Sequence, residues 1–281
     1  MDWSKAKTIL IIALIITNTL LGSVLFLDRN QADATIGDEF VLNSISLLKA
    51  KNINLNSVIP VDTEELFGLT VEFEIQDGSD LNYRFFHGDG KVEVDSEGLF
   101  TLSNGDETIS IINDKLIMYE SNPQTEKYNI LSSEIAETIA KDFLTQKGFS
   151  ISDLKLSFIK ENNGVYNLEY TKIFDESYVE STFTNIQLDN RGVIKMERNW
   201  LNMKDIGATK IQISSAPKSI LALLSMKEVY GKTIKDISLC YYFDPQKHSD
   251  TLNPQEAKQG TTTPAWRIQF EDGYKVIIDN Y

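Results

Sequence analysis

Few side chains in this 281-residue chain have the types and spacing that catalysis or metal binding requires. There is one cysteine, Cys240, and the two histidines, His87 and His248, lie far apart along the chain. A zinc site needs three or four such ligands, and a nucleophile needs a base close to it. Cys240 lies in the apolar run 237–243, so we expect a core side chain there and surface loops at both histidines.

Acidic residues occur in clusters, but their spacing predicts turns and solvated loops. Adjacent carboxylates point in different directions, and the spacing D-x-[DN]-x-[DN]-G of a calcium loop is absent. Phosphate-binding loops, nucleophile elbows and zinc-protease motifs are absent as well. We therefore expect no catalytic residue, cofactor or metal, with a wall hydrolase as a remote alternative. The clusters are Glu64-Glu65, Asp77-Gly78-Ser79-Asp80, Asp89-Gly90 and Asp175-Glu176.

The chain is acidic, with a formal net charge of −14. Such a charge repels phosphate backbones, so nucleic-acid binding is excluded. A single thiol cannot form an intramolecular disulfide, and the fold must therefore depend on its hydrophobic core.

Residues 8–27 contain no charged side chain and predict a transmembrane helix. About 20 helical residues span a hydrocarbon core of about 30 Å. Lys5 and Lys7 precede the segment, so the positive-inside rule leaves residues 1–7 in the cytoplasm. We therefore expect a single-pass protein of the cell membrane, with everything after Asp28 outside.

A cleaved signal peptide is the competing interpretation of the same segment. Ala32-Asp33-Ala34 has the A-x-A pattern of a cleavage site. The apolar run is longer than the usual 7–15 residues, however, and Asp28 and Arg29 place charges between the run and the triplet. These features favour a retained anchor.

One stripe of the predicted helix carries small and polar residues. Asn18 and Gly22 are four residues apart, and Thr19 and Ser23 repeat that spacing. Such stripes let membrane helices approach closely and form hydrogen bonds across the interface. We therefore predict contact with a partner helix at these four residues.

The remaining chain predicts helices followed by runs of strands, which indicates an α+β fold in two units, 28–130 and 131–281. In the first unit we expect a helix over 38–50 and strands over 71–75, 81–86, 91–94 and 108–119. In the second unit we expect a helix capped by Ser132 or Ser133 and ended by Gly148, then strands over 154–159, 165–174, 179–188 and 193–200. A third helix from Ser214 or Ser215 to Gly231 precedes strands over 237–243, 265–270 and 274–278, with a long loop at 245–263.

Aromatic residues are frequent in these strands, among them Tyr170, Trp200, Phe243 and Trp266. Packing in the core is the first interpretation. An exposed sheet face that docks another protein is the alternative, since aromatic residues dominate interface energetics.

Three segments resemble the YycI (WalI) family. They are MDWSKAKTI at 1–9, directly before the apolar run, GKTIKDISLCYY at 231–242, and PAWRI at 264–268. The resemblance implies α+β ectodomain units of the PepSY and beta-lactamase-inhibitor-protein type. It also implies a non-enzymatic accessory protein of Gram-positive bacteria.

In that family the expected partners are a YycH-like membrane protein and the sensor histidine kinase YycG (WalK), which controls cell-wall homeostasis. The alternative function is an extracytoplasmic PepSY-like binding module or protease inhibitor. The resemblance transfers no catalytic residue.

Overall fold

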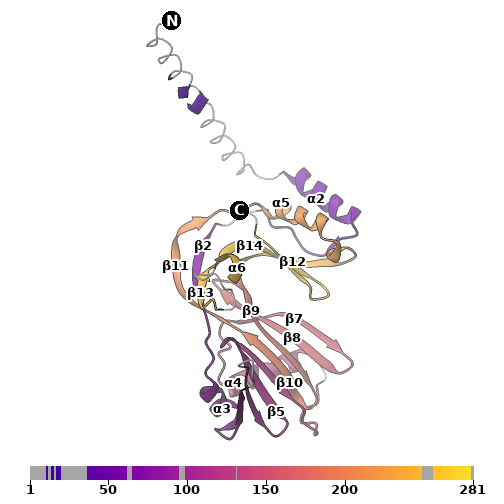
Figure 1. Ribbon diagram of the computed structural model, residues 1–281. Coiled ribbons are helices and arrows are strands. Elements are labelled where there is room, and N and C mark those ends of the chain that lie inside the picture. The colour runs from indigo at the N-terminus through magenta and orange to yellow at the C-terminus, as the bar shows by residue number, and fades with distance from the viewer. Residues whose placement is uncertain are drawn as a thin grey trace. The chain divides into compact units, whose positions relative to one another are not determined.

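The computed structural model describes residues 11, 14, 15, 17–19, 37–61, 65–94, 99–130, 132–248 and 256–279 (Figure 1). The chain divides into two compact units, 1–43 and 44–281, and the helix α2 (Asp38–Ala50) crosses the division. In the first unit, residues 11, 14, 15 and 17–19 are helical. The predicted tail 1–7 and the triplet 32–34 lie outside the described residues.

Among the residues that the structure describes, no helix is long and apolar enough to cross a membrane. Of the predicted segment 8–27, only six positions are described. The membrane anchor therefore stays a prediction.

The unit 44–281 is rich in strands, and most of these strands form one twelve-stranded sheet. Its main order is β15-β14-β12-β9-β10-β6-β5-β4-β3, while β8 pairs with β9, β7 with β8, and β1 with β12. The pairs β1–β12 and β9–β12 are parallel, and the others are antiparallel. The strands are β1 (Asn54–Leu55), β3 (Lys91–Val94), β4 (Phe100–Asn104), β5 (Glu107–Ile112), β6 (Leu116–Ser121), β7 (Leu154–Asn162), β8 (Val165–Phe174), β9 (Ser177–Asp189), β10 (Gly192–Asn199), β12 (Thr233–Tyr242), β14 (Thr263–Phe270) and β15 (Lys275–Ile278).

A second, three-stranded sheet has the order β11-β2-β13, formed by β11 (Leu201–Ile211), β2 (Leu66–Phe73) and β13 (Gln259–Thr261). The α+β prediction is confirmed. The predicted division near residue 130 stays a prediction, but β6 and β10, from either side of it, pair directly in one sheet.

Two helices cover one face of the large sheet. α4 (Ser133–Gln146) contacts β7, β8, β9 and β10, and α3 (Gly78–Phe86) contacts β4 (Figure 1). Apolar side chains of both helices and of the strands form one buried cluster between them, which includes Leu81, Phe85, Ala140, Leu144, Tyr170 and Met196.

The prediction for α4 is confirmed. Its signals lie within a few residues of the helix ends. The Ser132 hydroxyl accepts a hydrogen bond from the Ile135 amide at 3.4 Å, and Gly148 has a φ of +74° just beyond the helix. Ala136, Ala140 and Leu144 join Ile139 in the core, whereas Ile135 is 39% exposed.

The predicted strand over 81–86 is wrong, because these residues form the helix α3. The Asp77 carboxylate accepts from the Asp80 amide at 2.8 Å and caps the helix. Leu81 and Phe85 are then one helical turn apart and both are buried. A run of six apolar and polar residues fits either period, and the cap decides between them.

The predicted strand over 108–119 is also wrong, since it is the hairpin β5–β6. Its connection has three residues, 113–115, of which Asn113 and Asp114 have φ values of 52° and 56°. Asp175 and Glu176, which the sequence places in a turn or solvated loop, form the two-residue turn between β8 and β9, with φ values of 46° and 66°. The strands β4 and β11 were not predicted.

The third predicted helix is short and partly 3-10. It consists of α5 (Ala216–Ser219), η1 (Ile220–Ser225) and η2 (Lys227–Val229). The predicted loop 245–263 contains the short helix α6 (Pro245–His248) and the strand β13. Cys240 is fully buried, and Tyr170, Trp200, Phe243 and Trp266 are at most 3% exposed, so their assignment to the core is confirmed.

Candidate functional site

The large sheet has a second face, opposite α3 and α4, that carries polar side chains. Along β8, β9, β10, β6, β5 and β4, buried residues alternate with partly exposed ones. Leu168, Ile186 and Met196 point into the core, for example, and their neighbours point to the other face. We call this other face the polar face.

Strand register aligns the polar face into two rows that run across six strands. The first row is Asn167, Gln187, Lys195, Glu120, Thr108 and Ser103, and the second is Glu169, Asn185, Glu197, Met118, Ser110 and Thr101. Eleven of these twelve side chains are polar or charged. Directly opposed residues on one face of a sheet interact, so each row is a continuous line of neighbouring polar groups.

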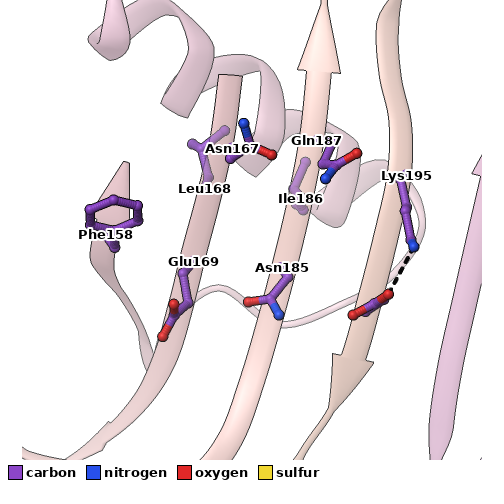
Figure 2. A pocket seen from close by; sticks show the side chains of 9 residues that line it. Phe158, Asn167, Leu168, Glu169, Asn185, Ile186, Gln187 and Lys195 are labelled. Carbon is purple, nitrogen blue, oxygen red and sulfur yellow. Dashed lines mark ion pairs between the residues drawn. The ribbon is translucent and has the colours of Figure 1, made fainter. Parts of the chain in front are cut away.

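A hollow of about 230 Å³ lies where both rows cross β8, β9 and β10. Figure 2 shows Phe158 on one side of it, the amides of Asn185 and Gln187 on the middle strand, and Lys195 on the other side. Asn167, Leu168, Glu169, Ile186 and Glu197 complete the lining. A second hollow of about 410 Å³ shares Gln187 and Lys195 and extends toward β5 and β6.

The charges of the hollow are paired. The Lys195 ammonium lies 3.0 Å from Glu197 and 4.0 Å from Glu120, and its hydrogen bond to Glu197 raises the pKa of Lys195. On the other side, Lys275 forms an ion pair with Glu169.

Lys275 connects the hollow to a buried ion network. Its ammonium also lies 3.3 Å from the carboxylate of Glu180, which is 2.7 Å from the guanidinium of Arg267. Glu180 and Arg267 are 4% and 1% exposed. Charges held in this way have little freedom to move, so the network fixes Glu169 at the edge of the hollow.

Two further groups define the hollow. The Oδ1 atom of Asn185 is buried and has no hydrogen-bond partner among the residues that the structure describes, which is costly unless another group donates to it. The ring of Phe158 packs against Gly273, where an added Cβ would lie 2.8 Å from the ring. Gly273 has a φ of +94°, so both its backbone and the close approach of the ring require glycine.

The arrangement suits recognition better than reaction. The carboxylates of Glu169 and Glu197 each form an ion pair with a lysine ammonium group, and an ion-paired carboxylate is a poor general base. Within the described ranges, no group of three His, Cys, Asp or Glu side chains could hold a metal ion.

Two of the four predicted partner-helix residues, Asn18 and Thr19, are described. Asn18 and Thr19 lie in the helical part of the first unit, with exposed side chains. The Thr19 hydroxyl donates to the Ile15 carbonyl at 2.8 Å, a bond within its own helix. Gly22 and Ser23 lie outside the described residues.

Where the structure describes them, members of the acidic clusters and His87 lie at the ends of α3 or in an ion pair. Asp77 caps α3, and His87 ends it in the left-handed conformation, with a φ of 53°. Glu65 lies 3.5 Å from Lys210, while Glu64 and the side chain of His248 are outside the described part of the chain.

Sequence reasoning missed the polar face. Its signal is the alternation of Asn, Gln, Glu and Lys with apolar residues along 165–174, 179–188 and 192–199. We weighed only the aromatic residues of these strands, most of which belong to the core.

No family model matches the chain, and no curated protein matches it in sequence. Among solved structures, it is similar to an uncharacterised protein from Eubacterium rectale ATCC 33656, with a TM-score of 0.53, 14% identity, and coverage of 88% of this chain and 97% of the other. YycH from Bacillus subtilis aligns with a TM-score of 0.49 and 15% identity, over 75% of this chain and 52% of YycH. The C-terminal domain of YpeB from Bacillus megaterium aligns with a TM-score of 0.36 and 10% identity, over 88% of this chain and 93% of that domain.

At this identity, the likeness to the Eubacterium rectale protein shows a shared fold alone. That protein is uncharacterised, so it brings no function to this chain.

Proposed function

We propose that this protein is a non-enzymatic, membrane-anchored regulator of a sensor histidine kinase of the YycG (WalK) type. Residues 8–27 form the anchor, and the strand-rich unit lies outside the cell membrane. The protein acts together with a YycH-like membrane protein in the control of cell-wall homeostasis.

The polar face is the observation that carries the non-enzymatic part of the proposal. Its carboxylates are held by ammonium groups, and its amides and hydroxyls form two ordered rows. Such a surface binds a partner or ligand through many preorganised polar groups, and it offers no activated nucleophile.

The anchor and the partners rest on the N-terminal sequence. Residues 8–27 are free of charge, Lys5 and Lys7 precede them, and residues 1–9 resemble the opening of YycI. Because the Thr19 hydroxyl already donates within its own helix, Asn18 is the stronger candidate for a hydrogen bond between helices.

Co-purification of the full chain from Gram-positive membranes tests this role. We expect recovery of a YycH-like protein and of the kinase, and lower recovery with Asn18→Leu or Gly22→Leu. An interhelical contact contributes about 0.6–2 kcal/mol, which corresponds to a roughly threefold to thirtyfold change in association. Thr17→Leu is the control, since residue 17 lies about 160° around the helix from Thr19.

Two outcomes would contradict the proposal. Unchanged recovery with both variants would remove the helix stripe from the mechanism. Full kinase regulation by a chain without residues 1–30 would remove the anchor from it.

An extracytoplasmic binding or inhibitor module is the second candidate, favoured by the hollow in the polar face. Incubation of the protein with secreted proteases distinguishes the two, because a regulator of this kind leaves protease activity unchanged.

A further inference from the structure

The hollow in the polar face offers side chains, but no free backbone, to a ligand. Its middle strand, β9, is hydrogen-bonded to β8 on one side and to β10 on the other. An extended peptide binds a sheet by adding a strand at an open edge. A ligand in this hollow must instead lie on the sheet and contact the side chains of both rows.

The charge balance of the hollow favours a neutral ligand. Lys195 pairs with Glu197, and Lys275 pairs with Glu169. An anionic ligand would have to replace one of these carboxylates, and a cationic ligand one of the ammonium groups. Both would leave a partly buried charge without its partner, which costs free energy.

The uncharged polar groups of the hollow are the amides of Asn167, Asn185 and Gln187. Each amide can both donate and accept hydrogen bonds. The Asn185 Oδ1 atom has no hydrogen-bond partner among the described residues, and a donor from a ligand would satisfy it once the side chain turns toward the hollow. A ligand that carries several groups able both to donate and to accept matches this set.

Phe158 adds an apolar wall beside these amides. Its ring lies close to Gly273, at the turn between β14 and β15. The volume of about 230 Å³ is smaller than the roughly 300–1,000 Å³ of pockets for drug-sized ligands. One ring, with an apolar face for Phe158 and polar edges for the amides, fits these dimensions.

We propose that this hollow binds one ring of an uncharged saccharide. The hydroxyl groups donate to Asn185 and exchange hydrogen bonds with Asn167 and Gln187, while the C–H face of the ring stacks on Phe158. This site is additional to the regulatory role proposed above and does not depend on it.

Titration of the full chain with two uncharged trisaccharides, maltotriose and triacetylchitotriose, tests the site, with binding measured by calorimetry. The detergent must lack a sugar headgroup, because a maltoside would occupy the same hollow. We expect a dissociation constant in the millimolar to micromolar range for at least one trisaccharide. Asn185→Leu should weaken binding about threefold to tenfold, because it removes one hydrogen-bonding group. Phe158→Ala should weaken it at least as much.

Asn202→Leu is the matched control, because Asn202 lies exposed on β11, in the other sheet, and should leave binding unchanged. Thermal unfolding of each variant establishes that it is folded. Absence of binding to both trisaccharides at millimolar concentration would overturn the proposal, as would binding that is unaffected by both substitutions in the hollow. Binding of an uncharged tripeptide in place of the saccharides would also overturn it. Loss of saccharide binding with intact recovery of the kinase would separate this site from the regulatory role.

Discussion

Loss of the buried ion pair between Glu74 and Arg198 should clearly reduce the stability of the strand-rich unit. The Arg198 guanidinium is 3.0 Å from a carboxylate oxygen of Glu74 and 2.9 Å from the hydroxyl of Thr184. It lies between the rings of Trp200 and Phe149, at 4.3 and 4.8 Å from their centres. The Arg198 side chain is 2% exposed, and this burial lowers its pKa.

Glu74→Gln removes the negative charge and keeps the size of the side chain. Breaking a buried pair from one side costs about 3–5 kcal/mol, because the remaining charge stays buried without compensation. The Glu74 side chain is 26% exposed, which reduces the loss. We therefore expect the free energy of unfolding to fall by about 2–3 kcal/mol, or the melting temperature by roughly 5–10 °C.

Glu72→Gln is the matched control. Glu72 lies two residues earlier, and its partner Lys204 is at the similar distance of 3.3 Å, but the two side chains are 45% and 52% exposed. Exposed pairs contribute about 0–1 kcal/mol. Urea unfolding of both variants measures the difference. Equal losses for Glu72→Gln and Glu74→Gln would refute the argument that burial determines the contribution.

Three further predictions concern single contacts. The hydrogen bond from Arg191 lowers the pKa of Asp189. This carboxylate therefore stabilises the fold above its unfolded pKa of about 3.9, and it loses that contribution as the pH falls through its lower folded pKa. Urea unfolding of the wild type and of Asp189→Asn across pH should show a difference in stability that disappears in acid. Ser132→Ala should cost about 1 kcal/mol by removing the cap of α4, measured by thermal unfolding. Gly78→Ala should destabilise the protein, because the added Cβ would lie within 2.5 Å of the Phe100 ring, although alanine favours helices. Hydrogen exchange of the amides of α3 measures the loss of stability.

Each of these predictions has a simple control. A difference between wild type and Asp189→Asn that persisted at the lowest pH would contradict the pKa argument. Ser133→Ala should be nearly neutral, since Ser132 and not Ser133 accepts the capping hydrogen bond. Gly37→Ala should be tolerated, because no atom lies within 4 Å of the position of its added Cβ.

The sequence by itself determined those elements whose signals lie within a few residues of one another. The pair Ser132-Ser133 and Gly148 located the two ends of α4, because caps are local interactions. The strand 165–174 was predicted with the bounds that the structure has. The uncharged segment 8–27 and the −14 charge likewise needed no structure.

Only the tertiary structure decided which faces are open and which charges meet. The Asp77 cap favours a helix over 81–86, but the core that buries Leu81 and Phe85 is completed by strands from later in the chain. Glu74 and Arg198 are 124 residues apart, and Glu180 and Lys275 are 95 apart. Such pairs, and the two rows of the polar face, depend on strand register. Register is fixed when the whole sheet buries its apolar side, so no short stretch of sequence reveals it.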